Sequence, residues 1–154
     1  MNNGPAADAQ LGERALMPGD RDDTLHEVTE VAVIRHPELG VLLLHSPDRR
    51  WHFPDTTVRV GEPWDESLRR AVRSATGITD LRIGPVLLLQ NFGPGEVDAR
   101  PQFGIFLRCT TRTSDLSSRH RWVRDAAELQ EAELFHPLVA DLVGRALEAR
   151  AGAR

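Results

Sequence analysis

The sequence predicts one α/β domain that is built around a mixed β-sheet. β-type apolar runs come first and are followed by one helical segment, and further apolar runs precede a terminal helix. The length of 154 residues suits one ordinary domain, and a hydrophobic content of 40% is near the average of folded proteins. We therefore expect layers of strands and helices around one core.

The elements follow from local patterns, taken from the N-terminus. Residues 1–23 are rich in Gly, Pro, Asp and Asn without periodicity, so we predict a flexible N-terminal arm before a single domain over residues 24–150. The runs VTEVAVIR and GVLLLH, joined by HPEL, predict a β-hairpin. WHF and TTVRV follow as short extended pieces on either side of Pro54.

A helix is predicted over residues 64–75, because Asp65 and Glu66 suit its first turn and Gly77 is a typical C-terminal stop. LRIGPVLLLQNF and PQFGIFLRCTT predict two strands, and RHRWVR predicts a third, short one. Asp125 is a typical N-cap for a short helix. The segment HPLVADLVGRALEAR predicts a terminal helix with one apolar face that consists of Leu138, Leu142, Val143 and Leu147.

The composition excludes several chemistries. The net charge of −4 argues against a nucleic-acid-binding domain. All 19 basic residues are Arg, so no Lys is present for a Schiff base or a P-loop. The one cysteine, Cys109, permits no internal disulfide and no multi-cysteine metal site, and its apolar surroundings indicate packing. No run is apolar enough for a membrane span or a signal peptide, so we expect a cytoplasmic protein without a membrane partner.

The segment GEPWDESLRRAVRSATGI resembles the Nudix box of the Nudix superfamily, and VLLLHS, WHFP and HRWVRDAAEL resemble its surroundings in order and spacing. The family pattern is G-x5-E-x7-R-E-U-x-E-E-x-G-U, where U is aliphatic. Glu62, Arg70, Val72 and the Gly77–Ile78 pair match it. The opening glycine falls on Thr56, and the three later glutamates fall on Ala71, Ser74 and Ala75. The resemblance implies a Nudix-like α/β/α sandwich with a mixed β-sheet.

In the family, these helix carboxylates hold a divalent metal, usually magnesium, against a diphosphate. Alanine offers no ligand atom, and a serine hydroxyl is a poor ligand for magnesium. The resemblance therefore implies a degenerate Nudix box, in which standard pyrophosphohydrolase activity is reduced by more than roughly 10³-fold. We expect no cofactor, and Mg²⁺ only if acids are relocated. The acids near the site in the sequence are Asp55, Asp65, Glu66, Glu96 and Asp98.

Several residues are candidates for roles in the site. Glu62 and Arg70 are expected to form an ion pair across the start of the helix, which is a structural role. Gly77 is expected to have a structural role too, at the end of the helix. If a reaction remains, His52 and Glu62 are the candidate catalytic groups. Five residues are candidates for substrate binding through anion contacts or ring stacking: His45, Arg50, Trp64, Ser74 and Arg108.

We therefore predict a Nudix-fold protein that binds a nucleotide-like or other anionic small molecule without standard Mg-dependent diphosphate hydrolysis. Two enzyme alternatives stay open. One is an active hydrolase of a nucleoside-diphosphate-linked substrate with relocated acids, and the other is a metal-independent biosynthetic enzyme that uses the same pocket. A structural or partner-binding role, as a homodimer through the terminal helix, is a third alternative. No helix-turn-helix signature indicates a nucleic-acid partner.

Overall fold

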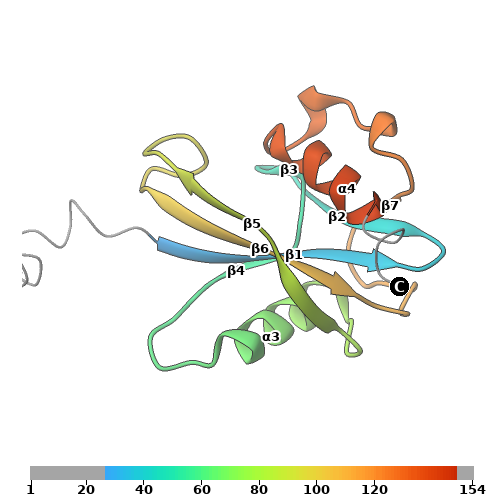
Figure 1. Cartoon of the computed structure of the whole chain (residues 1–154), viewed down its shortest axis with the longest axis horizontal. Helices are drawn as coiled ribbons and strands as arrows, with labels where there is room; N and C mark the ends of the chain where they lie inside the picture. The colour runs from blue at the N-terminus through green and yellow to red at the C-terminus, as the bar shows by residue number, and fades with distance from the viewer. Residues whose placement is uncertain (1–26, 149–154) are drawn as a thin grey trace, which may run out of the picture.

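The computed structural model describes residues 27–148 of the chain. Seven strands in this range form one mixed sheet, and two α-helices pack on its two faces (Figure 1). The central strand β1 (Glu27–His36) pairs with β6 on one side and with β2 and β4 on the other. The predicted α/β/α sandwich with a mixed β-sheet is confirmed. The predicted arm and the ends of the predicted domain, residues 24–26 and 149–150, lie outside the described range.

The remaining elements follow in the order predicted from the sequence. The strands are β2 (Gly40–Ser46), β3 (Arg50–His52), β4 (Asp55–Thr57), β5 (Arg82–Phe92), β6 (Gln102–Thr110) and β7 (His120–Val123). The helical elements are α3 (Trp64–Thr76), the 3₁₀ turns η2 (Ala126–Glu128) and η3 (Glu131–Glu133), and α4 (Leu138–Glu148). The strand order is β3-β2-β1-β6-β5, with β4 on β1 and β7 on β2. The predicted short helix after Asp125 is the 3₁₀ turn η2, and Asp125 Oδ1 caps it by accepting from the N–H of Ala127 at 3.0 Å.

The β1–β2 hairpin depends on a glycine. Arg35 pairs with Val41, and His36 pairs with Gly40, next to the turn. Gly40 has a φ of 102°, and a Cβ at this position would lie 2.0 Å from the carbonyl oxygen of Val123 in β7. The missing side chain therefore permits the close approach by which β7 pairs along β2.

Alternation along β1 divides the core between the two helices. Val31 and Val33 belong to the apolar cluster under α4, whereas Ala32 and Ile34 belong to the cluster under α3. Cys109 lies in the cluster under α3 and is fully buried. Burial raises the pKa of its thiol to about 12, which fits the predicted packing role.

Helix α4 closes one face of the sheet with a stripe of buried residues that consists of Val139, Leu142, Val143 and Ala146. Of the predicted apolar face, Leu142 and Val143 are buried, while Leu138 and Leu147 are partly buried against the same cluster. No helix within residues 27–148 is both long and apolar enough to cross a membrane.

Helix α3 covers the opposite face and ends one residue later than predicted. Gly77 follows Thr76 in the left-handed conformation, with a φ of 84°, and its N–H donates to the carbonyl oxygen of Arg73 at 2.8 Å. The hydroxyl of Thr76 donates to the carbonyl oxygen of Val72 at 2.6 Å and accepts from the N–H of Ile78 at 3.1 Å. The helix end is therefore fixed by local hydrogen bonds.

Candidate functional site

A cavity of about 580 Å³ lies on the face of the sheet that α4 covers. Four stretches of the chain contribute to its wall: residues 27–31, 48–57, 92–106 and 135–139. In Figure 1 this place lies between the loop that joins β5 to β6 and the helix α4. A cavity of this size holds a small organic molecule.

Four phenylalanines line the cavity and give it an aromatic wall: Phe53, Phe92, Phe106 and Phe135. The rings of Phe92 and Phe106 meet edge to face, with centroids 6.4 Å apart. Gly104 makes this packing possible, because a Cβ there would come within 2.8 Å of the Phe106 ring and 3.2 Å of the Phe92 ring. This part of the cavity wall is therefore apolar and aromatic.

A hydrogen-bond network around Gln102 forms the polar end of the cavity. The hydroxyl of Thr29 donates to Gln102 Oε1 at 2.8 Å. Gln102 Nε2 donates to Glu27 Oε2 at 3.1 Å and to Asp98 Oδ2 at 3.2 Å. One neutral amide therefore holds two carboxylates at this end.

Arg49 also lines the cavity and is already paired. Its two terminal nitrogens donate to the two carboxylate oxygens of Asp55 at 3.0 and 2.5 Å. Its guanidinium also lies 4.8 Å from the centroid of the Phe135 ring. Burial acts to lower the pKa of Arg49, but the hydrogen bond and charge of Asp55 outweigh it, so the pKa is raised. Arg49 is therefore a charged but occupied group.

His52 lines the cavity, yet both of its ring nitrogens have partners. Its Nδ1 lies 2.9 Å from the carbonyl oxygen of Phe53, and its Nε2 lies 3.1 Å from the hydroxyl of Ser46. Because a carbonyl oxygen only accepts, Nδ1 carries the proton and Nε2 accepts from the serine. Burial lowers the pKa of His52 further, which favours this neutral form. The geometry gives His52 a structural place and leaves its predicted catalytic role without a free nitrogen.

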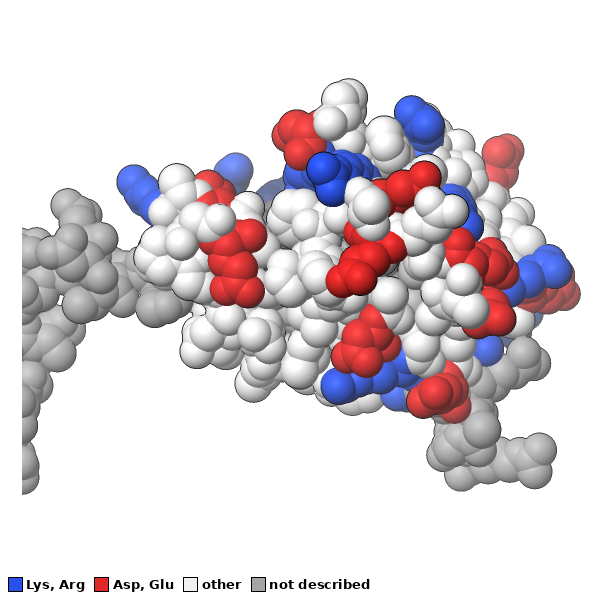
Figure 2. All heavy atoms as spheres, turned by 90° about the horizontal axis from the view of Figure 1, so that it is seen from above, with Lys and Arg blue, Asp and Glu red and all other residues white. Residues whose placement is uncertain are grey.

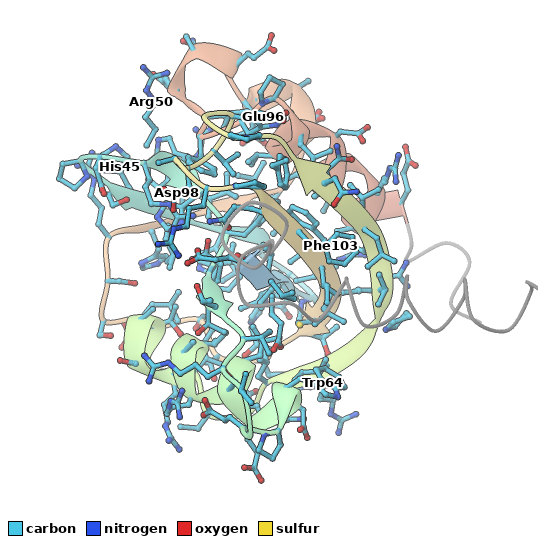
Figure 3. The ribbon with its side chains drawn as sticks, turned by 90° about the vertical axis from the view of Figure 1, so that its left-hand side faces the viewer. His45, Arg50, Trp64, Glu96, Asp98 and Phe103 are labelled. Carbon is cyan, nitrogen blue, oxygen red and sulfur yellow. The ribbon has the colours of Figure 1, made fainter. Side chains whose placement is uncertain are left out.

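Among the residues predicted for catalysis or substrate binding, His52 alone lines this cavity. His45 packs edge to face on Trp51, with ring centroids 4.9 Å apart. Arg50 has a positive φ of 60°, and its side chain donates to the carbonyl oxygen of Ala132 at 2.7 Å. Figure 3 shows Arg50 at the upper left and His45 at the left edge of the molecule.

The other three predicted binding residues also lie elsewhere. Trp64 is 51% exposed at the start of α3, and Ser74 is exposed on the same helix. In Figure 3 Trp64 lies at the end of the molecule opposite to the loop of Glu96 and Asp98. Arg108 lies on β6, and its Nε is buried with no hydrogen-bond partner in the described range. Their roles in binding stay predictions, and the cavity does not favour them.

The predicted pair of Glu62 and Arg70 is present. Arg70 Nη1 donates to Glu62 Oε1 and joins the loop before α3 to the second turn of the helix. The side chain of Arg70 is 52% exposed and that of Glu62 is 19% exposed. Since Glu62 already faces a guanidinium, its carboxylate is engaged in fixing the entry of the helix.

We expect Arg70→Ala to lower the free energy of unfolding by about 1 kcal/mol, because a partly exposed ion pair contributes little more. Urea unfolding of this variant, of Glu62→Gln and of the double variant measures the coupling between the two side chains. Arg73→Ala, which removes an exposed arginine from the same helix, is the matched control. Equal losses in Arg70→Ala and Arg73→Ala, or a loss that depends on Mg²⁺, contradict the structural role.

Glu30 is a residue that the sequence reasoning missed. It lies in β1, is 1% exposed, and neither carboxylate oxygen has a hydrogen-bond partner among the described residues. Burial raises its pKa from 4.5 to about 7, and the negative charges of Asp65 and Glu62 at the start of α3 add to the shift. The alternation in VTEVAVIR could have indicated that Glu30 is buried, because this pattern places it on the same side of the strand as Ala32 and Ile34.

The residues on α3 and beneath it do not fit the magnesium site that the Nudix resemblance implies. Ala71 has no ligand atom, and Ser74 and Ala75 are exposed. Ser67 Oγ and the carboxylate of Glu30 are buried and have no hydrogen-bond partner among the residues that the structure describes. Within residues 27–148, no group of three or more His, Cys, Asp or Glu side chains is arranged to hold a metal ion.

Comparison of whole chains reveals similarity in structure alone. No family model matches this chain, and no curated protein matches its sequence. A NUDIX-family hydrolase from Clostridium perfringens superposes with a TM-score of 0.67 at 14% identity, over 82% of this chain and 99% of that one. The MutT protein of Methanosarcina mazei Go1 gives 0.63 at 20% identity, over 84% and 96%. The Ap4A hydrolase of C. elegans gives 0.63 at 17% identity, over 82% and 99%. With the mixed sheet between α3 and α4, these likenesses show that the chain has the Nudix fold.

Proposed function

We propose that this protein binds a small organic molecule in the cavity of the Nudix fold and does not carry out standard Mg-dependent diphosphate hydrolysis. The observation that carries the proposal is the helix α3, where Ala71, Ser74 and Ala75 stand at the positions of the metal-binding acids. The one matching acid, Glu62, is held by Arg70. A cavity on the other face of the sheet, lined by four phenylalanine rings, supports ligand binding.

Thermal unfolding with a compound panel tests this function. The panel contains nucleosides, nucleotides and uncharged or cationic heterocycles, each with Mg²⁺ and with EDTA. A ligand at about 100 times its Kd stabilises the protein by about 2.7 kcal/mol, and we expect the stabilisation to be equal in EDTA. Val97→Trp, which fills part of the cavity wall, is expected to abolish it, whereas Val86→Trp on the exposed part of β5 is the control. A protein that no compound stabilises, or one stabilised only with Mg²⁺, contradicts the proposal.

One observation favours a second candidate, the hydrolase with relocated acids. Glu30 is a buried carboxylate with no hydrogen-bond partner in the described part of the chain, and Glu62 and Asp65 are close enough to raise its pKa. These acids lie on the α3 side, where the resemblance places the metal. Calorimetric titration with Mg²⁺ separates the candidates: we expect no site in the unmodified protein, and a tight site that Glu30→Gln abolishes establishes the second candidate instead.

The metal-independent biosynthetic enzyme receives less support from the geometry. Its proposed acid or base, His52, has both nitrogens in hydrogen bonds with Ser46 and Phe53. The anionic character expected of the ligand stays a prediction. The carboxylates that line the cavity favour a cationic ligand instead.

A further inference from the structure

Carboxylates outnumber cationic groups around the aromatic cavity. Its lining includes Glu27, Asp48, Asp55 and Asp98, whereas Arg49 is the one arginine in the lining and the chain has no lysine. With histidines counted as neutral, four carboxylates and one guanidinium give the lining a net charge of −3. Arg49 is neutralised by its two hydrogen bonds to Asp55. The uncompensated charge is therefore negative.

Two of these acids share one uncharged donor. Gln102 Nε2 uses its hydrogens on Glu27 and Asp98, so the amide orients both carboxylates without cancelling their charge. Asp98 comes from the β5–β6 loop and Glu27 from the start of β1, so two separate segments place acids at the same end. Figure 2 shows a run of acidic side chains on the part of the surface that belongs to this end of the sheet.

The aromatic wall strengthens the same preference. The faces of phenylalanine rings are electron-rich and attract cations, most strongly where water is partly excluded. The cavity already contains one such contact, since the guanidinium of Arg49 lies 4.8 Å from the centroid of the Phe135 ring. Phe92 and Phe106 lie in the same lining as Glu27 and Asp98, and no cationic side chain of the lining pairs with these two acids.

We propose that the ligand of this cavity presents a cationic nitrogen group, an amidinium, a guanidinium or an ammonium, to Glu27 and Asp98 while its flat part packs on the phenylalanines. This inference rests on the proposed small-molecule-binding function and names its ligand class. A phosphate or carboxylate at the same end is repelled by both acids and receives no guanidinium, because Arg49 is held by Asp55. The cavity therefore selects against free nucleotides.

Three probes with the same ring isolate the effect of charge: benzamidine is a cation, benzamide is neutral and benzoate is an anion. Amide chemical shifts of the ¹⁵N-labelled chain, followed in a titration with each probe, give both the site and the Kd. We expect benzamidine to shift the amides of Gln102, Gly104 and Phe106 and to bind at least roughly fivefold more tightly than benzamide. Benzoate is expected to bind most weakly.

Two isosteric variants locate the preference. Glu27→Gln combined with Asp98→Asn is expected to weaken benzamidine roughly fivefold and to leave benzamide unchanged, because only the charges are removed. Asp115→Asn removes a single negative charge from an exposed position outside the cavity and serves as the control for a general effect of charge.

Failure of this inference is distinct from failure of the proposed function. Benzoate binding as tightly as benzamidine, equal benzamidine affinity in the double variant, or no shift with any probe overturns the cation preference. The binding function itself falls only if the wider panel of nucleotides and heterocycles also fails to stabilise the protein. Binding of a nucleotide in the cavity without Mg²⁺ keeps the function and rejects the cation.

Discussion

Glu30→Gln is expected to raise the free energy of unfolding by about 3 kcal/mol near pH 8 and by less than about 1 kcal/mol near pH 5. Glu30 is 1% exposed and has no hydrogen-bond partner within residues 27–148, so its ionised form is costly in the folded protein. The amide of glutamine has nearly the same shape and never ionises. The variant therefore removes the charge while it keeps the packing under α3.

The pH window follows from the direction of the pKa shift. The pKa of Glu30 is raised from 4.5 in the unfolded chain to about 7 by burial and by the charges of Asp65 and Glu62. Below about pH 4.5 the carboxyl is neutral in both states and costs nothing. As the pH rises from 4.5 to 7, the unfolded chain ionises first and the folded state loses stability, until the loss is complete above about pH 7. Thermal unfolding at a series of pH values, with Glu66→Gln as an exposed control, measures this difference, and parallel pH profiles would falsify the assignment.

The triple variant Ala71→Glu, Ser74→Glu and Ala75→Glu is expected to convert α3 into a metal-dependent helix. Positions 74 and 75 are exposed and position 71 is partly buried, so the helix can accept the longer side chains without a clash in the core. Three carboxylates within about one turn repel one another, and Glu30 and Asp65 lie on the same side. The stability without metal should fall by roughly 1–2 kcal/mol, and saturating Mg²⁺ or Mn²⁺ should restore about 2–3 kcal/mol.

Unfolding measured with EDTA and with each metal checks this expectation. Arg73→Glu adds a carboxylate at an exposed position of the same helix, on the opposite side, and is expected to show no response to metal. Hydrolysis need not return, because groups that position water and substrate are separate from the metal ligands. If the triple variant gains no metal-dependent stability, the three positions do not converge on one site.

The elements that depend on neighbours in the sequence could be predicted. The hairpin follows from two alternating runs around a short turn, and the end of α3 follows from Gly77 because only a left-handed residue fits there. The pairing of Glu62 with Arg70 follows from their spacing across the helix start. In each case the interacting groups are close together in the sequence.

The cavity could not be predicted, because its geometry depends on distant parts of the chain. Thr29 and Gln102 are 73 residues apart in the sequence, and their hydrogen bond exists only because β1 lies parallel to β6. Trp64 and Arg50 were predicted to bind the ligand from their residue type alone. In the structure both lie outside the cavity lining, because Trp64 is exposed at the start of α3 and Arg50 has a positive φ. The alternation of residues in β1 could have predicted that Glu30 faces the core. The lack of a hydrogen-bond partner within residues 27–148 could not be predicted, because it depends on which side chains of α3 lie opposite to Glu30.

The parallel pairing of β1 with β6 has a consequence for how the chain folds. Nine residue pairs join the two strands, from Glu27 with Gln102 to Arg35 with Thr110, so each contact closes a loop of about 75 residues. During synthesis the β1–β2 hairpin can form early, but the other edge of β1 has no partner until residue 110 has left the ribosome. Long-range pairing of this kind slows folding, and the apolar middle of β1 stays open to other chains for that interval. Pairing of β1 with β6 should therefore compete with aggregation at this strand edge, and raising the protein concentration during refolding should favour aggregation.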